Sequence, residues 1–503
     1  MSHQVQEPVP GSPGPSQAPR STGRLVARNT AAQVVTFAAR AVAGLVAVVL
    51  IARHGGPHPL GVFQFGLTLS QMFSFAVGFG LPNLITREVA RDQDRSRDWI
   101  GLGVFVALSA GAVVTVALAF AMRFSGRPHE IVVAVSLAAV ALSFDTMGRL
   151  EFAAFEGWER MWLEAGATCL QEASFVAGTV AMLLTGHGAA GVMAAYVGSR
   201  MLGALTGWLV SSWHLGGPVA PRPPLDFLRR TLRRTVPFAL DDALSLTYIR
   251  IDAVLLGFIK GADAVGLYQA ATNLVLYLNI LARVLNTALY PRMSKAWPNL
   301  VRLGRWRDAS LQLLGLISVP AMIGSLLLAQ QTFDFIYTSK FDAAVRTYQV
   351  LAVIIAIRML GHTLGTSITA ANRQTARTVV VAAAAFTNIA LNIFFIPRWS
   401  YLGAAITTAI TETGVFVAYA ILARRFINPS KIVEAVALPA LACIPMVAVL
   451  LALRNHVNLL LTIAAGAAAY ALGLAAVAAV LVPPAARRHP RAAIRALIVR
   501  AVG

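Results

Sequence analysis

Long apolar stretches separated by short polar turns follow one another along nearly the whole chain. A helix needs about 20 apolar residues to cross the hydrocarbon core of a bilayer, and most of these stretches reach that length. Because unpaired backbone groups are costly in lipid, each stretch is expected to be a helix. The pattern predicts about fourteen transmembrane helices of this length. They are expected near residues 30–52, 60–84, 99–122, 130–150, 162–185, 189–213, 235–259, 264–290, 310–332, 346–370, 375–396, 401–423, 433–453 and 457–482.

The composition agrees with lipid as the natural solvent of this chain. The sequence is 57% hydrophobic and only 13% charged, whereas soluble proteins carry about 25% charged residues. The net charge of +20 does not indicate nucleic-acid binding, because the charges lie in short loops and form no basic domain. Cys169 and Cys443 both fall in apolar stretches, so we expect no disulfide framework, no metal site and no cofactor. The predicted fold class is an all-α polytopic membrane protein.

Positive charges alternate from loop to loop in the way that sets membrane orientation. If the N-terminus lies inside, the cytoplasmic segments are the two tails and every second loop. These segments hold most of the arginines, for example Arg87 to Arg97 in one loop and Arg222 to Arg234 in the longest one. One span missed or invented would destroy this alternation. Both termini are therefore predicted to be cytoplasmic.

The longest loop also divides the chain into two similar halves. LGVFQFG at 60–66 opens the second span and VGLYQAA at 265–271 opens the eighth. The number of residues that separates Gly61 from Gly266 also separates Gln64 from Gln269. Such a repeat is typical of parallel lobes related by an axis along the membrane normal. The expected organisation is a disordered tail 1–24, a six-helix N-lobe 25–213, a cytoplasmic linker 214–234, a six-helix C-lobe 235–424, two further helices 425–484 and a basic tail 485–503.

Charged side chains inside the predicted spans give the strongest functional signal. Each costs at least about 2.5–3.5 kcal/mol at bilayer depth, so such residues should face a water-filled cavity or a partner. Polar residues recur at helical spacing in spans one, two and seven to ten, which indicates that both lobes line one central cavity. An arginine-lined cavity suits an anionic ligand, because the guanidinium group matches phosphate geometry. The candidate cavity residues are Arg40, Arg283, Arg358, Arg200, Arg250, Gln33, Gln71 and Asn279.

Other polar residues in the spans have two interpretations. Asp252, Glu412 and Glu172 could bind a coupling ion such as a proton, but pairing with a buried arginine explains a buried carboxylate equally well. Asn388 and Asn392 lie one turn apart and are interpreted as helix–helix contacts.

Several stretches resemble one family of transporters. Tyr248 to Val275, YIRIDAVLLGFIKGADAVGLYQAATNLV, with YPRMSK at 290–295, resembles the seventh and eighth helices of bacterial polysaccharide (O-antigen, Wzx-type) flippases. NIALNIFFIPRWSYLGAAITTAITE at 388–412 is similar to that family's eleventh and twelfth helices, and GLPNLITREVAR at 80–91 fits its second. The resemblance covers residues 25–480. It places the chain in the MATE-like superfamily of multidrug, oligosaccharidyl-lipid and polysaccharide exporters.

The resemblance implies a transporter without catalytic residues in the bacterial cytoplasmic membrane. Two lobes would alternate between inward-open and outward-open forms and move a lipid-linked oligosaccharide, on undecaprenyl pyrophosphate, to the outer leaflet for surface polysaccharide synthesis. The pyrophosphate would meet the cavity arginines, and the glycan would meet polar groups such as Gln33, Gln71 and Asn279. The expected partners are this substrate, membrane lipid and, as candidates, other polysaccharide assembly proteins, with no nucleic acid.

Three alternatives stay open. A lipid II flippase of the same superfamily also has fourteen helices. A cation-coupled multidrug exporter typically has twelve helices and would need acidic residues to dominate the cavity, whereas arginines dominate here. A membrane polymerase or ligase of polysaccharide assembly is a different class, and the short outer loops disfavour it.

Overall fold

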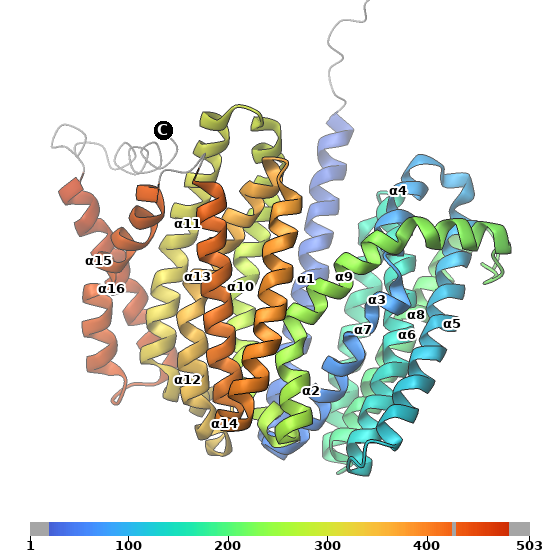
Figure 1. The fold of residues 1–503 in the computed structure, drawn as a ribbon, viewed down its shortest axis with the longest axis horizontal. Helices are drawn as coiled ribbons and strands as arrows, with labels where there is room; N and C mark the ends of the chain where they lie inside the picture. Colours follow the sequence, from blue (N-terminus) through green and yellow to red (C-terminus); the bar gives the residue numbers. More distant parts are fainter. Residues whose placement is uncertain (1–19, 425–428, 482–503) are drawn as a thin grey trace, which may run out of the picture.

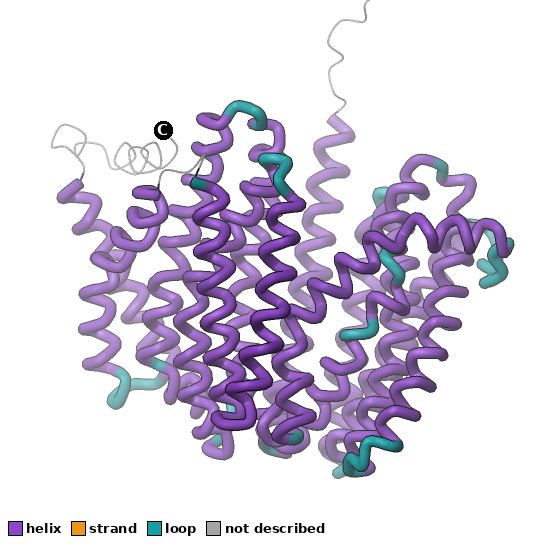
Figure 2. Tube along the Cα trace, in the orientation of Figure 1, coloured by secondary structure: helices purple, strands orange, loops and turns teal. Residues whose placement is uncertain are grey.

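The computed structural model describes residues 20–424 and 429–481, and every regular element within these ranges is a helix (Figure 2). Residues 1–19 of the expected N-terminal tail and the expected basic tail 485–503 lie outside the described residues. The first described helix begins at Arg20, so the last part of the expected tail belongs to a helix. The prediction of an all-α polytopic fold is confirmed.

The helices form two bundles and a hairpin (Figure 1). The first bundle, called the N-lobe, contains α1 (Arg20–Gly55), α2 (Pro57–Gln71), α3 (Ser74–Gly78), α4 (Leu81–Arg91), the 3-10 helix η1 (Gln93–Arg95), α5 (Ser96–Arg123), α6 (His129–Gly157), α7 (Met161–Leu184) and α8 (Gly188–His214). The second, called the C-lobe, contains α9 (Leu225–Lys260), α10 (Ala262–Ala296), α11 (Leu300–Leu327), α12 (Ala329–Ile336), η2 (Ser339–Ala344), α13 (Val345–Ala370) and α14 (Gln374–Ala423). The hairpin of α15 (Pro429–Leu453) and α16 (Leu459–Leu481) packs against α11.

The described helices account for the predicted spans. Ten are long and apolar enough to cross a membrane, and an eleventh span is the pair formed by α2 and the segment Ser74–Arg91, which bends by 43°. Three more segments complete the predicted set. Two are α8 and α9, whose polar residues lower their hydropathy, and the third is the second half of α14, which is two helices joined at a kink at Ser400.

A second break in this span, between α3 and α4 and beyond the 43° bend at residues 72–73, has a clear local cause. Phe79 and Gly80 both adopt the left-handed backbone conformation, with φ of 48° and 67°, which ends α3 and redirects the chain into α4. Glycine is suited to this conformation, and here it also allows close contact, because a Cβ on Gly80 would press against Phe238 of α9.

Two ends of the molecule need names for the description that follows. The tail face is the end at which α1 begins and α16 finishes, and the far face is the opposite end. In Figure 1 the two lobes meet near the far face and diverge toward the tail face.

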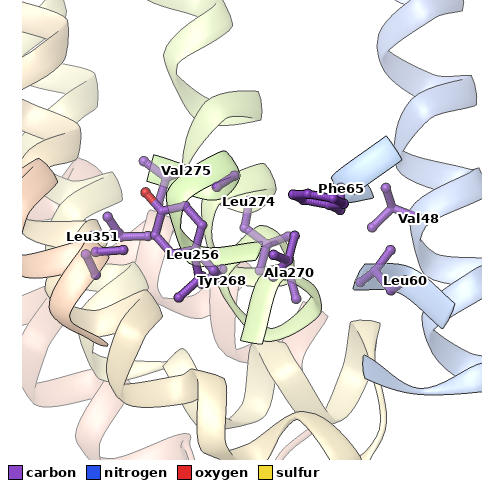
Figure 3. Packing of buried hydrophobic residues seen from close by; sticks show 14 of the residues in the cluster. Val48, Leu60, Phe65, Leu256, Tyr268, Ala270, Leu274, Val275 and Leu351 are labelled. Atoms are coloured by element: carbon purple, nitrogen blue, oxygen red, sulfur yellow. The ribbon is translucent and has the colours of Figure 1, made fainter. Parts of the chain in front are cut away.

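The apolar core reflects this divergence. One buried cluster includes residues of both lobes, such as Leu60 and Phe65 of α2 with Ala270 and Leu274 of α10 (Figure 3). Toward the tail face the lobes have separate clusters, one around Trp99 and Leu150 of the N-lobe and another around Met293 and Leu303 of the C-lobe. Apolar burial therefore joins the lobes mainly in their far-face halves.

One long helix connects the lobes. The expected linker 214–234 is a loop only up to Pro224, because α9 starts at Leu225 and runs for 36 residues. Its first turns lie on the N-lobe, where the Phe227 ring packs 4.8 Å from Trp99, measured between ring centroids. The rest of α9 packs against α14 in the C-lobe. Movement between the lobes must therefore bend or displace α9.

Candidate substrate-binding cavity

A pocket of about 520 Å³ lies inside the C-lobe. Residues of α9, α10, α13 and α14 line it. Polar stripes were predicted on the first three of these helices, whereas the polar residues of α14 were not part of that prediction, and α11, the ninth span, does not line the pocket. The polar stripe that we predicted on the first span does not contribute to this pocket. Its lining in the described structure comes from the C-lobe alone.

The pocket carries an excess of positive charge. Among the described residues that line it, Arg250, Arg283, Arg358 and Arg377 are opposed by two carboxylates, those of Asp252 and Glu412. At membrane depth such charges are held only where water or partners solvate them. The partners differ from one arginine to the next, and this difference separates structural from candidate binding residues.

Arg358 is neutralised within the protein. Its Nη2 atom lies 2.6 Å from Oε1 of Glu412, and both side chains are largely buried. Because this ion pair joins α13 to α14, Arg358 and Glu412 are explained by helix packing and need no ligand.

Arg283 and Arg250 have no carboxylate within ion-pair distance among the described side chains. Arg283 projects from α10 into the pocket and is exposed there, one turn beyond Asn279. Arg377 at the start of α14 lines the same pocket as Tyr419, a neutral group. These three guanidinium groups could accept an anion without displacing a carboxylate.

Asn279 offers a polar contact on the same wall of the pocket. Its Nδ2 atom donates to the carbonyl of Val275 over 2.8 Å. Its Oδ1 atom is buried and lacks a hydrogen-bond partner among the described residues. The side chain therefore keeps one acceptor that no group of the described structure uses.

Asp252 is held by neutral donors rather than by an arginine. Its Oδ1 accepts from Nδ2 of Asn392 over 2.7 Å, and its Oδ2 accepts from Thr408 over 2.6 Å and from Tyr268 over 3.0 Å. The side chain of Asn392 is further linked to Asn388 over 2.8 Å. The two asparagines that we interpreted as helix contacts thus belong to the shell of a buried carboxylate.

Arg200 and Glu172 lie together in the N-lobe, away from this pocket. The Nη1 atom of Arg200 is 2.8 Å from Glu172 and 3.5 Å from Asp145, and the guanidinium lies over the Tyr196 ring. Arg200 is only 5% exposed. The prediction that Arg200 lines the cavity does not fit this position, because two carboxylates from α6 and α7 already neutralise it inside the bundle.

The predicted stripe on the first span packs within the N-lobe. The Nε2 atom of Gln33 donates to Glu164 over 2.9 Å, and the Nη2 atom of Arg40 lies 3.8 Å from the same carboxylate. The Arg40 side chain remains 41% exposed, at the edge of this contact. Gln71 is half-buried at the end of α2 and does not line the C-lobe pocket. Gln33 and Gln71 are therefore not placed beside Arg283.

Sequence reasoning missed three residues of the site. Arg377 was not among the candidate cavity residues, although it lies on the first turn of α14 and reaches the pocket. Tyr268 contacts Asp252 from the next helix, α10, and Thr408 contacts it from α14, 156 residues further along the chain. The VGLYQAA repeat contains Tyr268 and was the only signal that could have drawn attention to it.

Comparison with known proteins gives consistent relatives. The profile of a family described as polysaccharide biosynthesis protein matches residues 26–297. A putative O-antigen transporter of Shigella flexneri is 22% identical over 384 residues, which cover 72% of this chain and 88% of that protein. The lipopolysaccharide biosynthesis protein WzxC of Escherichia coli K12 is 21% identical over 362 residues, covering 66% of this chain and 67% of that protein.

Solved structures share the fold. The lipid II flippase MurJ in an inward closed conformation superimposes with a TM-score of 0.73 at 14% identity, over 88% of this chain and 98% of that one. An inward-facing multidrug resistance transporter of the MATE family superimposes with a TM-score of 0.65 at 14% identity, over 80% of this chain and 98% of that one. At this level of identity the likeness concerns the fold alone.

Proposed function

Because the chain belongs to the polysaccharide biosynthesis protein family, we propose that it is a flippase for a lipid-linked oligosaccharide carried on undecaprenyl pyrophosphate. It moves this substrate from the cytoplasmic to the outer leaflet of a bacterial cytoplasmic membrane by alternating access, and the glycan serves surface polysaccharide synthesis. The relative described as an O-antigen transporter supports this assignment. The tail face and both termini are assigned to the cytoplasm, which agrees with the arginine-rich loops at that end.

The excess of arginine in the C-lobe pocket is the observation that carries the proposal. A pyrophosphate group bears negative charge, and guanidinium groups bind phosphate oxygens in a bidentate fashion. The candidates for this role are Arg283, Arg250 and Arg377, because no carboxylate pairs with them in the described structure. The acceptor of Asn279 beside Arg283 is suited to the first sugar.

The pocket size fits a headgroup. Small-molecule sites commonly measure about 300–1,000 Å³, and the volume of about 520 Å³ lies within that range. A long polyprenyl chain does not fit such a volume, and an apolar chain gains nothing by leaving lipid. We therefore assign the pyrophosphate and the first sugar to the pocket and the lipid tail to the bilayer.

Asp252 is our candidate for ion coupling. Glu412 and Glu172 already have arginine partners, so they are neutralised without an ion. Asp252 is 5% exposed and is surrounded by hydroxyl and amide groups. A buried carboxylate without a cationic partner is unfavourable unless a proton or another monovalent cation compensates it. Binding and release of that cation would couple its gradient to the movement of the lobes.

Lipid II flipping is the second candidate, because the fold of MurJ covers most of this chain. Its substrate has the same carrier, so the pocket alone does not separate the two functions. A multidrug exporter of cations is disfavoured by the positive charge of the pocket. Polymerase or ligase activity has no support from the relatives, which are described as transporters or biosynthesis proteins.

Binding of the carrier lipid to purified protein tests the role of the pocket. We expect undecaprenyl pyrophosphate to bind and undecaprenol, which has no phosphate, to bind far more weakly in native mass spectrometry. Arg283→Gln should weaken pyrophosphate binding by about tenfold to a hundredfold, the range expected for loss of a hydrogen bond to a charged group. Arg398→Gln is the control, because Arg398 contacts the carbonyl of Phe394 outside the pocket. Equal binding of the two lipids, or equal loss in both variants, would contradict the proposal.

A further inference from the structure

Hydrogen bonds between the two lobes gather at the far face. The Nε atom of Arg53 in α1 donates to the carbonyl of Ile336 over 3.0 Å, and the Nη1 atom of Arg127 donates to the carbonyl of Gly257 over 3.2 Å. His58 on the first turn of α2 contacts Asp263 on the first turn of α10. The far face is therefore closed by polar contacts that must break if the lobes are to separate there.

His58 differs from the two arginines because its charge depends on pH. Its Nδ1 atom lies 3.1 Å from Oδ2 of Asp263, and its Nε2 atom lies 2.7 Å from Oε1 of Glu130 in α6. Both ring nitrogens can donate a hydrogen bond only in the imidazolium form. The arrangement therefore requires a protonated His58, which joins one carboxylate of its own lobe to one carboxylate of the other.

Close backbone packing lies next to this bridge. A Cβ on Gly61 would overlap the carbonyl oxygen of Ala262, and a Cβ on Gly266 would overlap that of Pro57. Gly61 and Gly266 are the two equivalent positions of the internal repeat, so α2 and α10 meet through corresponding turns. Further along the same two helices, Phe65 packs into the apolar cluster shared by the lobes (Figure 3).

We infer that His58, Glu130 and Asp263 form a proton-dependent latch that holds the far face shut while the lobes are apart at the tail face. This inference rests on the alternating access proposed above. Loss of the His58 proton to the solvent leaves one ring nitrogen without hydrogen opposite a carboxylate, so one of the two contacts becomes repulsive. The lobes then separate more readily at the far face. In the proposed orientation, acid outside the cell favours the form that loads substrate from the cytoplasm.

The surroundings of His58 agree with this behaviour. His58 precedes Leu60, where the predicted span begins, and its side chain is 45% exposed. The hydrogen bonds to Asp263 and Glu130 raise its pKa, against a smaller opposing effect of burial. With a raised pKa, the latch is complete at low pH and is lost as pH rises through that value. Charged or titratable groups at this end of the neighbouring elements also include Arg53 and His54 of α1, Arg127, His129 of α6, Lys260 of α9, and Lys340 and Asp342 of η2.

The separation of the lobes at the far face can be measured directly. Spin labels at Ser125→Cys in the N-lobe and Ser339→Cys in the C-lobe, in a Cys169→Ser, Cys443→Ala background, report this distance by pulsed electron resonance. Both label positions are exposed. The full chain in lipid nanodiscs is compared at about pH 5.5 and about pH 8, on either side of the usual histidine range. We expect the longer-distance population to rise by about threefold at the higher pH, the size of effect expected for an exposed ion pair.

Five variants separate the latch from general effects of pH. In His58→Gln and Asp263→Asn the longer-distance population should be raised at both pH values. Glu130→Gln should have a smaller effect, because Glu130 and His58 belong to the same lobe. His58→Arg keeps the charge and should remain closed at both. His129→Gln, at a neighbouring exposed histidine of the same face, should behave as the parent. A parent distance that is independent of pH, or a His58→Gln protein that still responds to pH, would overturn the latch. These distances are measured without substrate, so that result would not contradict the proposed flippase function. Conversely, a failure to bind the carrier lipid would not contradict the latch.

Discussion

Asp252 and Glu412 line the same pocket, yet their side chains have different partners. Glu412 is held by Arg358, whereas Asp252 is held by Asn392, Thr408 and Tyr268. A carboxylate with a fixed arginine partner stays ionised, whereas one held by neutral groups can exchange its charge with a mobile cation. This contrast, rather than burial alone, leads us to assign coupling to Asp252.

The variant Asp252→Asn tests this assignment. The amide removes the charge while keeping the size of the side chain, so binding of undecaprenyl pyrophosphate should be retained. Export of surface polysaccharide should fall by about tenfold or more, in line with a typical coupling free energy. Asp98→Asn, at an exposed carboxylate near Arg95, should export normally. Normal export by Asp252→Asn at equal protein levels would show that coupling does not pass through this residue.

The sequence could indicate which residues are charged within the membrane but not which of them are paired. Arg358 and Glu412 are separated by 54 residues, and Arg200 meets Glu172 from a different helix. Helical spacing defines a face of one helix and does not say which neighbour covers that face. For this reason Arg200, Arg358 and Arg283 looked alike in the sequence, although only Arg283 lacks a carboxylate partner in the described structure.

At the scale of helices, hydropathy predicted the spans but not their internal breaks. The second span is divided into α2, α3 and α4, and the break between α3 and α4 falls within the apolar run FAVGFG, where the pattern contains no polar residue to mark it. Conversely, α9 extends over residues 225–234, because Leu228 and Leu232 pack on the N-lobe while the intervening arginines face outward. The proline-rich stretch before Leu225 marked the true loop, and the arginines after it belong to an amphipathic helix.

The packing of α2 on α10 gives a prediction at this scale. Gly61→Ala should push the two helices apart, because the new methyl group would overlap the Ala262 carbonyl. Overpacking of this kind costs about 1–3 kcal/mol, so the closed far face should be depleted at every pH. The Ser125–Ser339 spin-label distance measures this, with Gly198→Ala as the control because the space around Gly198 is open. An unchanged distance in Gly61→Ala would mean that the glycine pair does not set the closure.

At the scale of the whole molecule, the two-lobe repeat and the fold were predictable because the sequence repeats LGVFQFG and VGLYQAA at the same helix ends. Which lobe lines the cavity could not be predicted in this way. We expected both lobes to line it, but the polar stripe of α1 is used to hold Glu164 of α7, and the pocket lies in the C-lobe. The lobes thus differ: the N-lobe arginine Arg200 is paired with carboxylates inside its own bundle, whereas Arg250, Arg283 and Arg377 of the C-lobe pocket have no carboxylate partner in the described structure.

The sidedness of lipid-linked glycan in cells tests the central claim most directly. An impermeant sugar-modifying reagent or lectin would be applied to a deletion strain, to the strain with the parent gene restored and to the strain with Arg283→Gln. Flipping by this protein predicts that lipid-linked oligosaccharide accumulates on the cytoplasmic face in the deletion strain, that the parent gene restores it to the outer face and that Arg283→Gln does not. If the glycan reaches the outer face normally in the deletion strain but is neither polymerised nor attached, the protein acts after flipping, and the account is contradicted.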